Sequence, residues 1–241
     1  MSAFFNATIY QPFYNAFIFL IGSLPFLDAG VIIIIFTIIT KLVLLPLSIK
    51  ASIAQMEMKS HEKNLNDIKE KHKDNKEEYG RKQLEYYKEH GINPFSSIFI
   101  LLIQLPILIG VYQVFIKSGL PAINTALLYS FVSAPLVVNM LFLNLIDISH
   151  KSLVLALLAG ITTYFQASFA SPLQTKGNTS KQGDLAKAMA VQMKYILPVF
   201  MAYISYIISG AVALYLITSN LFAIGQELYI KKKYHKTTIV V

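Results

Sequence analysis

Hydrophobic residues fall into long uncharged runs, which are separated by segments rich in charged residues. A helix of about 20 apolar residues can cross the hydrocarbon core of a bilayer. On this basis we expect five transmembrane helices, at residues 28–50, 95–117, 131–146, 152–170 and 195–226. A helix over the last run would be longer than a core of about 30 Å. We therefore expect it to tilt, to kink near Ser209 and Gly210, or to protrude.

The first 27 residues form a further apolar stretch, which polar residues and prolines interrupt. Asn6, Gln11, Pro12 and Asn15 lie among several aromatic residues in this stretch. Aromatic side chains are typical of the headgroup boundary of a membrane. We interpret residues 1–27 as an amphipathic segment that forms an interfacial helix, with a true span as the alternative.

Residues 51–94 carry nine Lys or Arg and nine Asp or Glu residues, and they have almost no Gly or Pro before Gly91. This composition predicts a solvated helical hairpin that reverses near Asp74 and Asn75. The remaining polar segments connect the spans or follow them. We expect loops at residues 118–130 and 171–194, a short turn at 147–151, and a basic tail at 227–241.

The distribution of Lys and Arg sets the expected orientation, because cytoplasmic loops carry an excess of these residues. The hairpin with Lys50, the 147–151 turn and the basic tail are predicted to be cytoplasmic, and the N-terminus to lie outside. The 171–194 loop then lies outside despite its four lysines, which conflicts with the rule. The expected fold is an all-α integral membrane protein with a five-transmembrane-helix core bundle in the cell membrane.

Composition excludes several classes of protein. The chain has 241 residues, is 55% hydrophobic and contains no cysteine, which excludes an intrinsically disordered chain, disulfides and thiolate metal sites. The five histidines form no HExxH motif. We expect no cofactor and no metal. The net charge of +8 is explained by membrane orientation, so we expect no specific DNA binding.

Lys41 is the most informative residue, because it lies in the middle of the apolar run 29–47. A charge at the centre of a bilayer costs roughly 2.5–3.5 kcal/mol on insertion scales. Snorkelling is the simpler alternative, but Lys50 at the polar end of the helix is about 13 Å away. We therefore predict a hydrated cationic site within the membrane. The polar residues expected to line it with Lys41 are Thr37, Ser48, Gln104, Asn139 and Gln166.

Catalysis has little support in the sequence, so we expect no enzyme. Asp28 and Asp147 lie at the ends of spans, and His150 lies in a loop, so no nucleophile has a positioned base. Two functions of the cationic site around Lys41 remain open at this point. One is an anion or small-solute conduit gated by Lys41. The other is a hydrolase, whose turnover would be lost in Lys41→Arg.

Three stretches resemble the YidC/Oxa1/Alb3 family of membrane protein insertases, in the short form without a large periplasmic domain. They are TIITKLVLLPLSIKASIAQMEM, YYKEHGINPFSSIFILLIQLPILIGVYQVF and SGAVALYLITSNLFAIGQE. The resemblance implies a groove that opens to the cytoplasm and to lipid and is closed outside. Its usual cation is an arginine where Lys41 stands here. Lysine can lose its proton when desolvated, whereas arginine stays charged.

The resemblance also implies a mechanism without covalent chemistry. A hydrophilic segment of a nascent membrane protein enters the groove, and its apolar neighbour slides into lipid along two spans. The candidate contacts for this slide are Phe99, Tyr112, Phe115, Phe200, Tyr203 and Tyr215. The implied partners are nascent membrane proteins and the lipid bilayer, with contacts to the ribosome and the Sec translocon.

Overall fold

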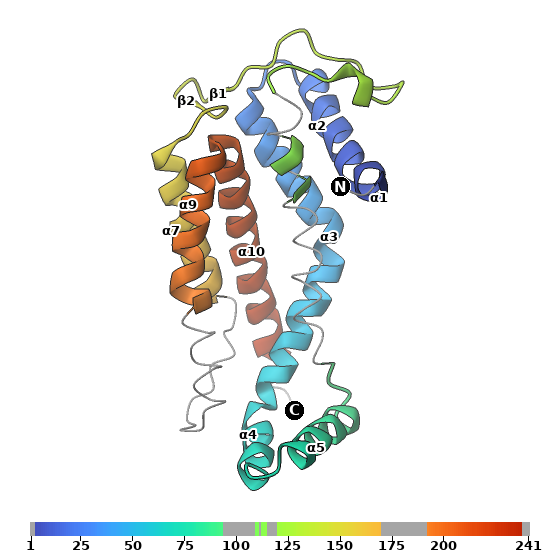
Figure 1. Ribbon diagram of the computed structural model, residues 1–241, viewed down its shortest axis with the longest axis vertical. Helices are drawn as coiled ribbons and strands as arrows, with labels where there is room; N and C mark the ends of the chain where they lie inside the picture. Colours follow the sequence, from blue (N-terminus) through green and yellow to red (C-terminus); the bar gives the residue numbers. More distant parts are fainter. Residues whose placement is uncertain (1–2, 94–108, 111, 115–119, 170–191, 238–241) are drawn as a thin grey trace.

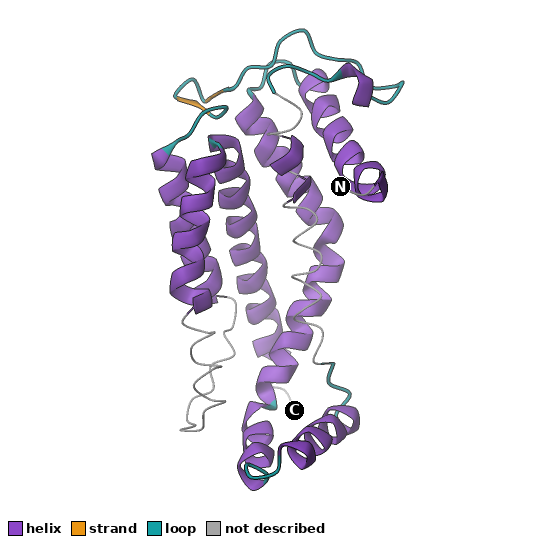
Figure 2. Ribbon diagram, in the orientation of Figure 1, coloured by secondary structure: helices purple, strands orange, loops and turns teal. Residues whose placement is uncertain are grey.

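The computed structural model describes residues 3–93, 109–110, 112–114, 120–169 and 192–237. The described residues are mainly helical, with one antiparallel pair of two-residue strands. In Figure 1 long helices run side by side, an irregular segment lies across one end, and a small helical pair lies at the other. Figure 2 shows that loops are concentrated at these two ends. The molecule is therefore a helical bundle with two unlike ends.

The N-terminal helix runs without a break from residue 3 to residue 23. It comprises α1 (Ala3–Phe5), the π-helical segment η1 (Asn6–Tyr10) and α2 (Gln11–Ser23). Phe17 is buried and, like Phe13, meets the ring of Phe36 edge to face. Such pairs add about 0.5–1.5 kcal/mol beyond area burial. The N-terminal segment is thus a packed helix, and its interfacial placement stays a prediction.

Helix α3 (Ala29–Ser60) includes the apolar run with Lys41 and continues into the polar segment. Asp28 begins it by accepting a hydrogen bond from the backbone N–H of Val31 at 3.0 Å, as expected at a helix N-terminus. The helices α4 (Glu62–Lys71) and α5 (Lys76–Glu89) follow, and a short turn joins them so that they contact each other at an angle (Figure 1). Asn75 caps α5 by accepting from the N–H of Glu78 at 3.1 Å.

Residues 120–152, which we name the cap, differ from the predicted helix over 131–146. The described structure there is irregular, with η2 (Thr125–Leu127) before the short strands β1 (Leu141–Phe142) and β2 (Ile146–Asp147). Pro135 lacks a backbone N–H, which disfavours a continuous helix. Leu143 and Asn144 have φ values of 51° and 58°, so the chain makes a left-handed turn between the strands. The apolar composition of residues 131–146 therefore does not correspond to a transmembrane helix.

The predicted single span at 195–226 is also wrong, because the chain reverses within it. The π-helical segment η3 (Gln192–Ile196) leads into α9 (Leu197–Ile208), and α10 (Gly210–Thr237) runs back beside it. Ser209 adopts an extended conformation with φ −173° and ψ 162°. A Cβ on Gly210 would lie 3.1 Å from the Cα of Ile148, so the small residue permits this close turn. The kink expected at this position is thus a full reversal.

Helix α7 (Leu153–Phe169) packs against both α9 and α10, and α10 packs against α3. At the contact with α9, a Cβ on Gly160 would lie 2.8 Å from the Cβ of Ala202. Small residues let neighbouring helices approach closely where lipid supplies no hydrophobic driving force. Helices α3, α7 and α10 all begin at the cap, and α9 runs in the opposite direction.

Two contacts fix which loops share an end of the bundle. The backbone N–H of Gly210 donates to the carbonyl of His150 at 2.8 Å, so the 147–151 turn lies at the start of α10. The ammonium of Lys231 donates to the carbonyl of Phe169, so α7 ends beside the C-terminal part of α10. The 147–151 turn is therefore at the cap, opposite the hairpin, and not on the hairpin side as predicted.

Candidate functional site

Lys41 lies at the boundary between two faces of α3. One helical turn earlier, Thr37 is fully buried, while the neighbouring Leu42 and Val43 are 51% and 71% exposed. Lys41 itself is half-buried. The hydroxyl of Thr37 donates to the carbonyl of Ile33 at 2.6 Å, so its own helix satisfies it. The side chain of Lys41 thus lies between the packed face of α3, which includes Thr37, and the exposed apolar face, which includes Leu42 and Val43.

Ser48 fixes the depth of Lys41 relative to α10. The amide of Gln226 donates to the Ser48 hydroxyl at 2.7 Å, and this hydroxyl lies 3.0 Å from the Gln226 Oε1. Because α3 and α10 both run from the cap towards the hairpin, positions seven residues earlier on each helix lie about 10 Å nearer the cap. These positions are Lys41 and Ser219. Lys41 is therefore level with the buried Ser219, well inside the apolar part of the bundle.

At the same level of α10, Asn220 joins that helix to α7. Its amide donates to the hydroxyls of Thr162 and Thr163, at 3.2 and 2.9 Å. Gln166 follows one turn later on the same face of α7 and is half-buried. We name Lys41, Ser219, Asn220, Thr162 and Thr163 the polar layer. It places one cation and several amide or hydroxyl groups at one depth among apolar helices.

The remaining predicted groove residues do not join the polar layer. Asn139 lies in the cap, where its carbonyl accepts from the N–H of Ala29 at 2.7 Å and its side chain accepts from the N–H of Leu141. It therefore lies at the start of α3, far from the level of Lys41. Gln104 lies outside the described residues. Gln226, which bridges to Ser48, was missed because it stands at the end of an apolar run without a partner nearby in sequence.

The predicted slide residues have mixed positions. Phe200 and Tyr203 on α9 are 51% and 62% exposed, and Tyr112 is 39% exposed. Tyr215 is buried in the core at 1% exposure, so it cannot contact a substrate at the surface. Phe99 and Phe115 lie outside the described residues. The exposed apolar surface next to the polar layer includes Leu42 and Val43 of α3, which the sequence analysis did not single out.

The cap covers the end of the bundle at which α3 and α10 begin. Besides the two contacts to Ala29 and Gly210, the N–H of Ala211 donates to the carbonyl of Ile148 at 2.9 Å. Asp28 accepts from the N–H of Leu143 at 3.1 Å through its second carboxylate oxygen. One short segment is thus hydrogen-bonded to the first turns of two helices. The cap and α3 are also in close contact, because a Cβ on Gly30 would lie 2.3 Å from the ring of Phe142.

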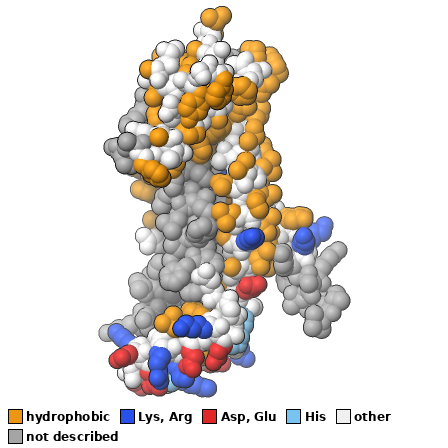
Figure 3. Space-filling model, turned by 90° about the vertical axis from the view of Figure 1, so that its right-hand side faces the viewer, with side chains coloured by type: hydrophobic (Ala, Val, Ile, Leu, Met, Phe, Trp, Pro, Cys, Tyr) orange, Lys and Arg blue, Asp and Glu red, His pale blue; other side chains and the backbone are white. Residues whose placement is uncertain are grey.

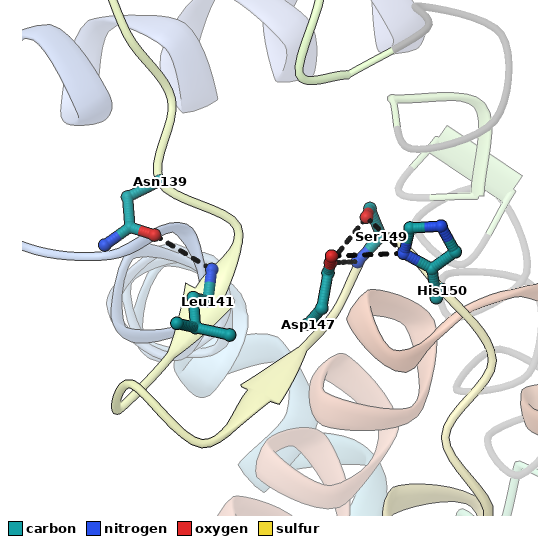
Figure 4. Close-up of polar contacts among 5 residues, drawn as sticks. All are labelled: Asn139, Leu141, Asp147, Ser149 and His150. Atoms are coloured by element: carbon teal, nitrogen blue, oxygen red, sulfur yellow. Dashed lines mark hydrogen bonds and ion pairs between the residues drawn. The ribbon is translucent and has the colours of Figure 1, made fainter.

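Asp147, Ser149 and His150 lie together in the cap but are not arranged as a hydrolytic triad (Figure 4). The Ser149 hydroxyl donates a hydrogen bond to a carboxylate oxygen of Asp147 at 2.5 Å and lies 3.1 Å from His150 Nδ1. The same Nδ1 also lies 3.1 Å from the other Asp147 oxygen. The hydrogen bonds from Ser149 and His150 hold the pKa of Asp147 below its ordinary value. This cluster orders a turn and leaves Ser149 without a base that activates it.

The described residues contain no group of three or more His, Cys, Asp or Glu side chains that could hold a metal ion. The chemistry available in the polar layer is electrostatic attraction and hydrogen bonding. Helices 29–58 and 210–233 are long and apolar enough to cross a membrane, and two shorter apolar helices accompany them. Figure 3 shows hydrophobic side chains along the bundle and charged side chains gathered over α4 and α5.

These features define a mainly helical protein with apolar helices long enough to cross a membrane. The chain belongs to the family described as 60Kd inner membrane protein, whose model matches residues 22–237. The membrane protein insertase YidC of Clostridium tetani is 33% identical over 219 residues, or 90% of this chain and 88% of that protein. YidC of Fusobacterium nucleatum is 30% identical over 85% of this chain and 86% of its own length. The insertase MisCB of Bacillus subtilis is 30% identical over 97% and 82%. The family resemblance is confirmed.

Proposed function

We propose that this chain is a membrane protein insertase in which Lys41 draws a hydrophilic segment of a nascent membrane protein part-way into the bilayer. The observation that carries the proposal is the position of Lys41, in the polar layer and beside the exposed apolar side chains of α3. A segment attracted there has a shorter hydrocarbon path left to cross. The apolar neighbour of that segment can leave sideways into lipid. The names of the relatives support the same activity.

The proposed orientation places the hairpin in the cytoplasm and the cap outside. All Lys and Arg residues except Lys41, Lys117 and Lys151 then belong to the hairpin with Lys50, to the segment between α7 and α9, or to the C-terminal part of α10 and the tail. Both ends of that segment leave the bundle at the hairpin end. The conflict with the positive-inside rule therefore disappears. The C-terminus stays cytoplasmic in this arrangement, as predicted.

The proposed groove lies between α3 and α10 and includes the polar layer, Ser48, Gln166 and Gln104. Pro46 lies inside α3, and proline commonly bends a helix. The exposed residues Tyr112, Phe200 and Tyr203 are the proposed slide contacts, together with Phe99 and Phe115. Nascent chains, the ribosome and the Sec translocon are the proposed partners.

A charge-reversal series at Lys41 tests this function. Lys41→Glu should abolish insertion of a single-span substrate with an acidic hydrophilic tail, because like charges repel. Lys41→Arg should retain insertion, because the charge is kept. Insertion is measured in proteoliposomes by protease protection of the substrate. The control is Lys50→Glu at the exposed end of the apolar run, which should leave insertion largely intact. Equal activity of all three variants would overturn the proposal.

An anion conduit gated by Lys41 is the alternative, and it needs a path open at both faces. The hydrogen bonds from the cap to α3 and α10 argue against such a path. Single cysteines at Ser48 and Asn220, which are half-buried, can be probed from either side with a water-soluble thiol reagent, because the natural chain has none. An insertase predicts labelling from the hairpin side alone. Labelling of position 220 from the cap side would favour the conduit.

A further inference from the structure

The cap has a composition that its fold does not explain. Residues 121–146 contain no Asp, Glu, Lys, Arg or His, although the described part of this stretch crosses the bundle end as irregular chain and not as a span. A water-exposed connection of this length normally carries charged residues. The absence of charge therefore needs a cause other than the formation of a transmembrane helix.

The cap directs large apolar side chains away from the protein. Phe131, Leu136, Val137 and Leu145 are 74%, 102%, 80% and 79% exposed. Phe26, in the turn between α2 and α3 at the same end, is 79% exposed. Figure 3 shows hydrophobic side chains over this end of the molecule up to its tip. Exposed apolar patches of this kind mark sites of contact with a membrane or a partner.

The cap is nevertheless an ordered part of the fold, because other side chains of the same segment are buried against the helices. Val132, Met140 and Ile148 are buried at 6%, 8% and 0% exposure and pack in the main core. Inward and outward side chains therefore share one segment. The inward residues hold the cap on α3 and α10, and the outward residues have no part in that packing.

Exposed apolar side chains also lie on the helices next to the cap. Leu153 and Val154, in the first turn of α7, are 61% and 60% exposed, and Ile207 at the end of α9 is 45% exposed. Lys151 lies with its ammonium 5.9 Å from the ring centre of Tyr206. A lysine beside a tyrosine is typical of the headgroup region. Exposed apolar side chains therefore lie on both sides of the charged turn at 147–151.

We propose that the cap is a lipid-binding surface that lies at the headgroup–acyl boundary of the leaflet opposite the hairpin, with Phe131, Leu136, Val137 and Leu145 inserted among acyl chains. The depth is shallow because irregular backbone needs water or protein partners for its polar groups. The exposed side chains of Asp147, His150 and Lys151 border this surface where the cap joins α7 and α10. This surface is independent of the proposed groove, so it holds or fails separately from the insertase activity.

Quenching by lipid-borne nitroxides tests the depth in the full-length protein, in phosphatidylcholine and phosphatidylglycerol vesicles. A bimane label is attached to single cysteines that replace Leu136, Val137 or Leu145. Nitroxide at carbon 5 of the acyl chain should quench these labels at least about twofold more strongly than nitroxide at carbon 12. Leu84, 58% exposed on α5, supplies a matched leucine in the charged hairpin, where no lipid quenching is expected. Val199, 70% exposed in the first turn of α9, lies about as far from the reversal at Ser209 as Ser219 does on α10 and supplies a matched valine that carbon 12 should quench best.

Three outcomes would overturn the proposal. Quenching at 136 and 145 equal to that at 84 would place the cap in water. Stronger quenching by carbon 12 would place it deep in the hydrocarbon. Protection from both lipid nitroxide and aqueous iodide would mean that protein covers the cap. A second variant, Leu136→Asp with Leu145→Asp, should shift the emission of a label at 137 towards its value in water. Leu84→Asp should leave that emission unchanged.

Discussion

At the cap end, backbone hydrogen bonds join the starts of α3 and α10 to one short segment, whereas at the hairpin end the two helices are joined through the side chains of Ser48 and Gln226. Backbone contacts with Ala29, Gly210 and Ala211 hold helix positions closely. A contact between two polar side chains can be exchanged for water. The two ends of the bundle therefore differ in how firmly α3 and α10 are held together.

Breaking the close contact between the cap and α3 should have the largest effect on stability. In Gly30→Ala the new Cβ would overlap the ring of Phe142, so β1 or the helix must shift. We expect a loss of about 1–3 kcal/mol in the free energy of unfolding, as for other overpacked cores. Unfolding is followed in mixed micelles by denaturant titration. Gly225→Ala, with open space around it on α10, is the control and should not destabilise.

Removing the carboxylate at the start of α3 should have the next largest effect. Asp28→Ala deletes the hydrogen bonds to the N–H groups of Val31 and Leu143, and it should lower stability by about 0.5–2 kcal/mol. Hydrogen exchange should rise at residues 141–148 and not in α4 and α5. Asp28→Asn keeps an acceptor for the helix and should recover most of the loss. Uniform exchange across both ends would contradict the comparison.

A stabilising change at the other end sharpens the contrast. Gly80 lies within α5, with no heavy atom within 4 Å of a Cβ placed there. Gly80→Ala should therefore stabilise the hairpin by about 0.5–1 kcal/mol, because alanine loses less backbone freedom on folding. Slower hydrogen exchange in α5 is the measurement. A destabilised hairpin would mean that this face of α5 packs against a further part of the protein.

The smallest effect is expected for a hydrogen-bond cluster in the hairpin. The Tyr86 hydroxyl lies 2.7 Å from His61 Nδ1 and accepts from the Asn64 amide at 2.8 Å. Tyr86→Phe removes both contacts but keeps the ring that stacks on His90. Because Asn64 and His90 are exposed, water can replace the lost partners, and we expect less than about 0.5 kcal/mol. A loss above about 1.5 kcal/mol, measured by the same titration, would show that this end is held as firmly as the cap.

Sequence patterns identified the helical character and the polar hairpin segment, and they singled out Lys41 within an apolar run. They were wrong where apolar composition was taken to predict one transmembrane helix. Residues 131–146 are apolar but belong to the irregular cap, and 195–226 holds two helices because Ser209 and Gly210 permit a sharp reversal. Both errors have one cause. Hydropathy reports which residues avoid water, but backbone contacts with distant residues decide where the chain turns.

The polar layer shows a similar limit for site residues. Asn220 is more than 50 residues away from Thr162 and Thr163 in the sequence, and only the packing of α7 on α10 brings them together. Asn139 and Tyr215 looked equally suitable by residue type, yet the first lies in the cap and the second in the core. Residue chemistry suggested candidates, and helix pairing selected among them.

The reversal at Ser209 has a consequence for how this protein itself enters the bilayer. By hydropathy the stretch from α9 to the middle of α10 is one continuous apolar run, yet the chain reverses within it. As a single helix without the reversal, it would place Lys231, Lys232 and Lys233 at the end of the bundle opposite the hairpin. We therefore expect the two helices to enter the bilayer as a folded-back pair. Their turn is hydrogen-bonded to Ile148 and His150 in the segment that precedes α7.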